Sequence, residues 1–100
     1  MITFHRLALA DVREAQVWYR ERSLPAALKF HSALDSTISG IADDPGRFAE
    51  VRPGYQYARM FGFPYIVVFK AWSADRINVM AVMHTSRQTD FWIDRDPRDI

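Results

Sequence analysis

The chain has 100 residues, of which 49% are hydrophobic, and a formal net charge of +1. This length suits one domain, residues 1–100, with a single modest core, and the apolar content is sufficient for folding without disulfides or a structural metal. The net charge is too small to imply general electrostatic affinity for nucleic acids.

The sequence also indicates where the protein works and what it does not bind. It contains no cysteine, which fits a reducing compartment. No apolar run approaches the roughly 18 residues that a membrane helix requires, and the N-terminus lacks the apolar stretch of a signal peptide, so we expect a soluble cytoplasmic protein. The three histidines are scattered singly and the glycines are isolated, so we expect neither a metal site nor a phosphate-binding loop, and no cofactor.

The N-terminal half predicts one short strand and two helices. Residues 2–5 are β-prone and short, so we expect them to pair with a later sheet. From residue 8 apolar side chains recur every three or four positions, which predicts a helix that ends at residue 22 or 23. Ser23 is a suitable N-cap for a second helix, and Pro25 suits the first turn of that helix. A turn at residues 43–46 is expected to end it. The two helices predict an αα-hairpin.

The C-terminal half predicts a small sheet. Residues 47–56 have no clear period and are expected to form a loop, followed by a strand at 57–61. Residues 65–72 and 77–84 are apolar almost throughout, and the four residues between them suit a hairpin loop. Charges alternate from residue 93 on, which indicates a solvated tail. The predicted fold class is α+β: an N-terminal strand, an αα-hairpin and a three-stranded antiparallel meander, with both helices on one side.

Cationic side chains stand at the ends of these predicted strands. Eleven of the thirteen lysines and arginines are arginine, and guanidinium groups hold phosphates or carboxylates in a fixed, bidentate geometry. Arg59 and Arg87 could therefore converge on one face of the sheet, bind an anionic or polar partner, or stabilise charge in a transition state. The alternative is that each arginine pairs with an acid or lies exposed.

Other polar and aromatic residues near the C-terminus also have two interpretations. His84 could shuttle a proton or donate to a phosphate, or it is a half-buried histidine bonded to the backbone. Ser86 lies two residues further on, but the absence of a glycine elbow gives no reason to expect a triad. Phe91 and Trp92 could stack on a base or anchor a peptide, but we favour a lid over a small core.

The order of elements, with Arg59, the Phe63-Pro64-Tyr65 segment, the run 77–84, Arg87 and Phe91-Trp92, resembles the RelE/ParE superfamily of toxins from type II toxin–antitoxin systems, often labelled plasmid stabilisation proteins. The resemblance spans nearly the whole chain. It implies a RelE/ParE-like fold in a bacterial, cytoplasmic toxin. It also implies a cognate antitoxin whose C-terminal segment wraps the toxin surface. Apolar surface kept for that antitoxin could support a homodimer.

Two mechanisms occur in this superfamily. RelE-like members cleave messenger RNA in the ribosomal A site with basic residues and often a C-terminal tyrosine, whereas ParE-like members poison DNA gyrase. Arg59 and Arg87 match arginines of the RelE-like nucleases. However, Arg47 and Arg52 stand where those nucleases carry lysines, and Phe91-Trp92 replaces the tyrosine. Arginine is a poor proton acceptor, so the resemblance favours the ParE side.

The resemblance therefore favours a DNA gyrase inhibitor over an enzyme. Such an inhibitor would contact its target through Arg59, His84, Arg87 and Trp92. One alternative is a ribosome-dependent mRNA endonuclease, in which Arg59, Arg87 and His84 would be the catalytic residues. The other is an inactive family member that only binds the antitoxin.

Overall fold

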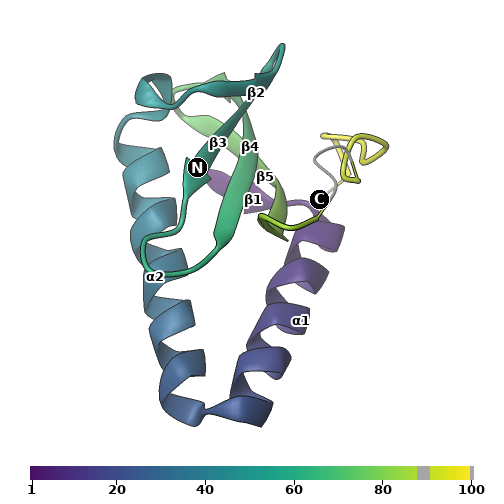
Figure 1. The fold of residues 1–100 in the computed structure, drawn as a ribbon. Helices are drawn as coiled ribbons and strands as arrows, with labels where there is room; N and C mark the ends of the chain where they lie inside the picture. The colour runs from purple at the N-terminus through teal and green to yellow at the C-terminus, as the bar shows by residue number, and fades with distance from the viewer. Residues whose placement is uncertain (88–90, 100) are drawn as a thin grey trace.

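The computed structural model describes residues 1–87 and 91–99. A short strand precedes two long helices, and a single 3-10 turn, four strands and a C-terminal segment follow them (Figure 1). In chain order the elements are β1 (Ile2–Phe4), α1 (Arg6–Arg22), α2 (Leu24–Asp43), the turn Pro45–Arg47, β2 (Glu50–Arg52), β3 (Tyr55–Arg59), β4 (Tyr65–Ser73) and β5 (Arg76–His84). The predicted α+β class, the αα-hairpin and the three-stranded meander are confirmed.

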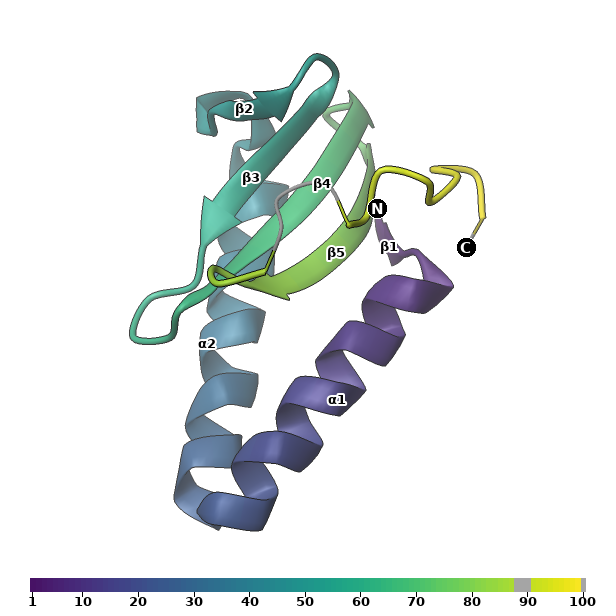
Figure 2. The ribbon, with the colours of Figure 1, turned by 45° about the vertical axis from the view of Figure 1, so that its right-hand side comes forward.

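The five strands form one sheet in the order β1-β5-β4-β3-β2. β1 runs parallel to β5, and the other neighbours are antiparallel. The N-terminal strand thus joins the later sheet, as predicted, because the helical hairpin supplies the long crossover that parallel strands need. Both helices lie on the same face of the sheet (Figure 2).

The prediction of a loop over residues 47–56 is wrong from residue 50 on. Glu50–Arg52 form β2, and β3 begins at Tyr55 rather than at residue 57. The turn between them contains Gly54, whose φ of 84° lies in the region that only glycine adopts readily. A strand of three residues is too short to show a period, so only its pairing with β3 reveals it.

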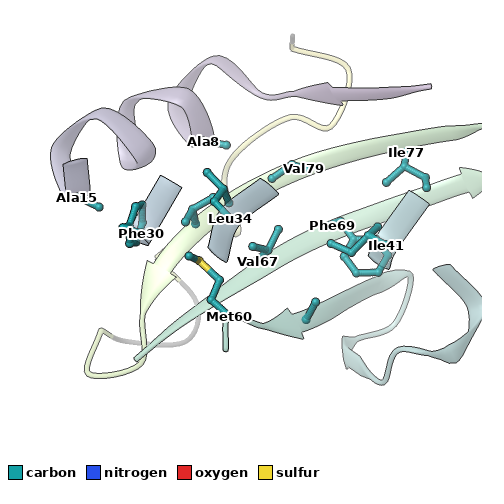
Figure 3. Close-up of a cluster of buried hydrophobic side chains, with 12 residues drawn as sticks. Ala8, Ala15, Phe30, Leu34, Ile41, Met60, Val67, Phe69, Ile77 and Val79 are labelled. Carbon is teal, nitrogen blue, oxygen red and sulfur yellow. The ribbon is translucent and has the colours of Figure 1, made fainter. Parts of the chain in front are cut away.

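A helix-side core lies between the hairpin and the sheet (Figure 3). α2 contributes large side chains, including the fully buried Phe30 and Ile41, whereas α1 buries the small residues Ala8 and Ala15. Each large buried side chain stabilises the fold by about 1.5–3 kcal/mol. The small side chains of α1 allow its backbone to approach β5 closely.

A second core covers the opposite face of the sheet. Trp92, which is 1% exposed, packs over Val68, Met80 and Met83, and its ring centroid lies 5.0 Å from that of Tyr55. The predicted lid over a small core is confirmed. β4 is apolar almost throughout because successive side chains meet the helices on one face and the C-terminal segment, residues 91–99, on the other.

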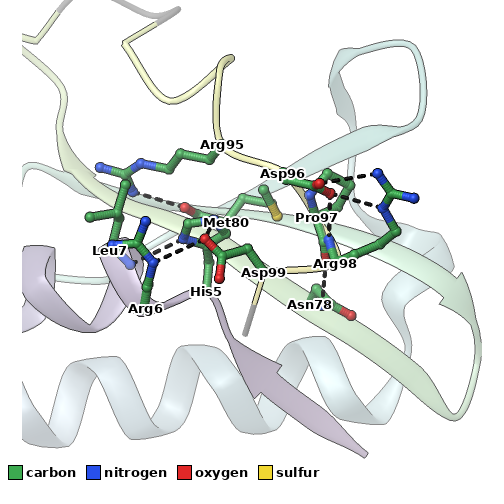
Figure 4. A network of polar contacts seen from close by, with 10 residues as sticks. All are labelled: His5, Arg6, Leu7, Asn78, Met80, Arg95, Asp96, Pro97, Arg98 and Asp99. Carbon is green, nitrogen blue, oxygen red and sulfur yellow. Dashed lines mark hydrogen bonds and ion pairs between the residues drawn. The ribbon is translucent and has the colours of Figure 1, made fainter.

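The prediction of a solvated C-terminal tail is wrong in part, because Asp94, Asp96 and Arg98 are exposed but Arg95 is not. Arg95 is only 10% exposed and holds Asp11 of α1 in a bidentate ion pair, with N···O distances of 2.7 and 3.1 Å. Arg95 also donates to the carbonyl of Met80 at 2.9 Å (Figure 4), and Asp11 accepts from the N–H of Val82 at 3.1 Å. β1 stops at Phe4, so these two side chains satisfy backbone groups along the edge of β5 that lack a partner strand.

Candidate functional site

A cavity of about 290 Å³ opens between α1 and the adjoining ends of β4 and β5. We call it the α1 cleft. Helix α1 supplies a wall that includes Glu14, Trp18 and Tyr19, and the strands supply Tyr65 and His84, with Arg87 beyond the end of β5. The cleft therefore combines aromatic rings with groups of both charges.

His84 is the last residue of β5 and lies opposite Tyr65 in the β4–β5 register. The two rings meet edge to face, with centroids 5.2 Å apart. The Nδ1 atom accepts a hydrogen bond from the Ser86 N–H at 3.0 Å and contacts Ser86 Oγ at 2.7 Å. An accepting Nδ1 places the proton of the neutral ring on Nε2. His84 is thus a half-buried histidine bonded to the backbone, as one of the two interpretations held, and its Nε2 is a donor.

Arg87 lies at the mouth of the α1 cleft and remains 51% exposed. Its Nη2 is 3.6 Å from Glu14 Oε1, a carboxylate that is itself 75% exposed, and its guanidinium carbon lies 4.9 Å from the centre of the Phe91 ring. Solvent screens such an ion pair, so it contributes at most about 1 kcal/mol. A partner carboxylate could replace Glu14 without a large penalty.

Two tyrosines in the cleft are shifted away from ionisation. Burial raises the pKa of Tyr65, and the neighbouring Tyr19 and Glu14 raise it further, against a smaller opposite effect of Arg87. Burial also raises the pKa of Tyr19. Both phenols therefore stay neutral near pH 7, where they can donate or accept hydrogen bonds but do not act as bases.

The structure does not bring Arg59 and Arg87 into one cavity. Arg59 ends β3 and lines a separate cavity of about 420 Å³, beside Phe61 and small residues of α2 such as Ser36 and Gly40. The two arginines differ in position because Arg59 ends β3 whereas Arg87 follows the end of β5, and β4 lies between these two strands.

Trp92 does not offer its ring to a partner, because it is 1% exposed within the second core. Its indole N–H is buried without a hydrogen-bond partner among the described residues. The side chain therefore supports the sheet beneath the cleft rather than forming part of an exposed contact surface.

Sequence reasoning missed the α1 wall of the cleft. Glu14 is a charged residue outside the apolar pattern of the first helix, and Trp18 lies four residues further on, on the same helix face. Only Tyr65 could have been assigned to the cleft from the sequence, because pairing the predicted strands 65–72 and 77–84 places Tyr65 opposite His84. Nothing local to the helix indicates which of its flanks faces β5.

Across residues 1–87 and 91–99, no three side chains of the metal-ligating types lie close enough together to hold an ion. Within the same part of the chain, no helix has both the length and the apolar character needed to cross a membrane.

Comparisons with known proteins bear directly on this fold. A search of curated proteins found no match. The family model described as the ParE toxin of the type II toxin–antitoxin system parDE matches residues 2–89, a stretch that includes both helices, all five strands, His84 and Arg87. The resemblance to the RelE/ParE superfamily and the preference for its ParE side are thereby confirmed, and the chain belongs to the ParE toxin family of type II toxin–antitoxin systems.

Proposed function

We propose that this toxin acts in the bacterial cytoplasm by binding and inhibiting DNA gyrase, and that a cognate antitoxin neutralises it. The observation that carries the proposal is the match to the ParE toxin family over residues 2–89, since ParE-like toxins are the gyrase-directed branch of the superfamily. The proposal assigns target contacts to Arg59, His84 and Arg87, while Trp92 holds the surface beneath them in place.

The chemistry of the α1 cleft supports binding rather than RNA cleavage. A general base must accept a proton near pH 7, but the cleft phenols are held neutral and guanidinium groups do not deprotonate. The two carboxylates that line the cleft, Asp11 and Glu14, are each paired with an arginine. In the neutral ring of His84, Nε2 carries the proton and Nδ1 accepts from the Ser86 N–H. Nδ1 could therefore accept a proton from a substrate only if His84 gave up its bond to Ser86. The two lysines of the chain, Lys29 and Lys70, do not line the cleft.

The exposed cations suit a protein partner. Arg87 is half-exposed and weakly paired, and Arg59 is exposed at the end of β3. Arginine forks pair bidentately with carboxylates, and arginine is enriched among the residues that dominate binding energy at protein interfaces. We expect Arg87→Ala to weaken gyrase inhibition by about 10-fold or more, which corresponds to a loss above about 1.4 kcal/mol.

The test combines a purified and a cellular assay. Supercoiling by purified gyrase is measured against increasing toxin for the unmodified protein, Arg59→Ala, Arg87→Ala and the control Arg20→Ala, an exposed arginine of α1 outside both cavities. DNA and protein synthesis are then pulse-labelled within minutes of inducing each protein without antitoxin. Inhibited supercoiling with an early failure of DNA synthesis, reduced by Arg87→Ala but not by Arg20→Ala, is the expected result.

Two other outcomes would overturn the proposal. Early failure of protein synthesis with cut ribosome-bound messages would identify a ribosome-dependent endonuclease. An unaffected host, together with retained antitoxin binding, would identify an inactive family member.

A further inference from the structure

An aromatic and cationic cluster lies at the opposite end of the sheet from the α1 cleft. Trp72, near the end of β4, is 42% exposed. It stands seven residues along the strand from Tyr65 of the cleft, a separation of about 23 Å at strand rise. Lys70 on β4 and Arg76 on β5 lie over its ring, and Lys70 also lies over the ring of Tyr55 on β3. We call these four residues the Trp72 cluster. None of them takes part in the function proposed above.

The Trp72 ring is held in a fixed orientation. Its indole N–H donates to Asn78 Oδ1 at 3.1 Å, and Asn78 is only 2% exposed. The Asn78 amide in turn donates to the carbonyl of Pro97 at 2.8 Å, so the C-terminal segment anchors it (Figure 4). A half-exposed ring that is already oriented loses little conformational entropy when a flat ligand stacks on it.

The two cations of the cluster are held by aromatic rings rather than by carboxylates. Lys70 Nζ lies 4.9 Å from the centre of the Tyr55 ring and 4.8 Å from that of Trp72, and the Arg76 guanidinium carbon lies 5.2 Å from Trp72. The ion pairs formed between described residues all involve other cations. Lys70 and Arg76 therefore keep their charge available for an anionic ligand.

We propose that the Trp72 cluster binds single-stranded nucleic acid. A base that stacks on Trp72 takes the place of Lys70 or Arg76 over the ring, and the displaced cation then holds the adjoining phosphate. A duplex would not suit this surface, because its base faces are hidden and the net charge of +1 supplies little attraction for a regular double helix. With two phosphate contacts, the logarithm of the binding constant should fall against the logarithm of salt concentration with a slope of about −1.4.

The experiment measures fluorescence anisotropy of fluorescein-labelled dT and U 12-mers with the full-length protein at low salt. We expect Trp72→Ala to weaken binding about 5- to 150-fold. The double variant Lys70→Ala/Arg76→Ala should weaken binding and make the binding constant depend less on salt concentration. It leaves the Trp72–Asn78 hydrogen bond in place, so it tests the site even if the Trp72→Ala variant does not fold. The control is Arg13→Ala/Lys29→Ala, which removes the same charge from exposed helix positions.

Each outcome decides the proposal. Stronger binding of the dT 12-mer would identify single-stranded DNA as the ligand, and stronger binding of the U 12-mer would identify RNA. Absence of binding, equal losses in the two double variants, or equal affinity for a labelled duplex would overturn it. Preferential binding of a labelled polyglutamate peptide would overturn it in favour of an acidic protein partner.

Discussion

His5 connects strand β1 to helix α1 through a single buried side chain. Its backbone N–H donates to the Val79 carbonyl at 2.8 Å, which continues the pairing of β1 with β5. Its Nδ1 accepts from the Leu7 N–H at 3.0 Å and so caps the helix. Histidine is an uncommon N-cap, and this one requires an unprotonated Nδ1. The choice of residue therefore makes the strand–helix junction sensitive to pH.

We predict that the stability of the fold falls below about pH 6.5 because of His5. Burial lowers the pKa of His5, and the attraction of Asp99 offsets this only in part. The unfolded chain then binds a proton that the folded chain resists, so the stabilisation is complete above the unfolded pKa of about 6.5 and is lost as the pH decreases. Urea unfolding at pH 8, 7, 6 and 5 would measure the free energy of unfolding at each pH.

The matched variant is His5→Asn, because asparagine keeps a capping oxygen and does not titrate. Its free energy of unfolding should change less between pH 7 and 5 than that of the unmodified protein. Parallel pH profiles for the two proteins would show that His5 does not cause the loss.

At the scale of elements, one residue joins the two helices. Ser23 is both the C-cap of α1, with its N–H donating to the Tyr19 carbonyl at 2.7 Å, and the N-cap of α2, with its Oγ accepting from the Ala26 N–H at 3.3 Å. Its extended φ of −167° turns the chain without a glycine. This junction could be predicted from the sequence because capping depends on groups only a few residues apart.

We predict that Ser23→Ala destabilises the protein by about 1 kcal/mol, since it leaves the Ala26 N–H without its acceptor. In a domain of this size, that loss lowers Tm by about 4–8 °C. Ser23→Asp should retain most of the stability. Ser32→Ala, at an exposed position within α2, should change it little, and calorimetry of the three variants would measure the difference. An equal loss for Ser32→Ala would contradict the capping role.

At the scale of the whole molecule, the C-terminal segment connects parts of the chain that are far apart in sequence. Trp92 completes the second core, and Arg95 joins the segment to Asp11 of α1 and to the edge of β5. Asp99 accepts from Arg6 Nε at 3.0 Å (Figure 4). The segment has no helix or strand of its own, so its place depends on these contacts.

We predict that Arg95→Ala lowers the free energy of unfolding by about 3–5 kcal/mol, because it leaves the carboxylate of Asp11 in a largely buried site without its counter-charge. Arg98→Ala is the control. Arg98 pairs with Asp96 at the surface, and its loss should change stability little. Denaturant midpoints of the two variants would compare the pairs. Similar midpoints would mean that the Arg95–Asp11 pair does not stabilise the folded state.

The sequence by itself determined the features that depend on neighbours along the chain. The period of α1, the cap at Ser23 and the apolar runs of β4 and β5 arise from contacts over a few residues, so they indicated the α+β class and the family. The site residue His84 could be placed at a strand end for the same reason.

Only the tertiary structure decided which distant side chains meet. Charges after residue 93 indicated a solvated tail, yet Arg95 is buried against Asp11, 84 residues away. Likewise β2 is revealed by its pairing with β3, and Arg59 and Arg87 are kept in separate cavities by the strand between them. Such contacts depend on the packing of the whole chain, which local patterns of charge and hydrophobicity do not specify.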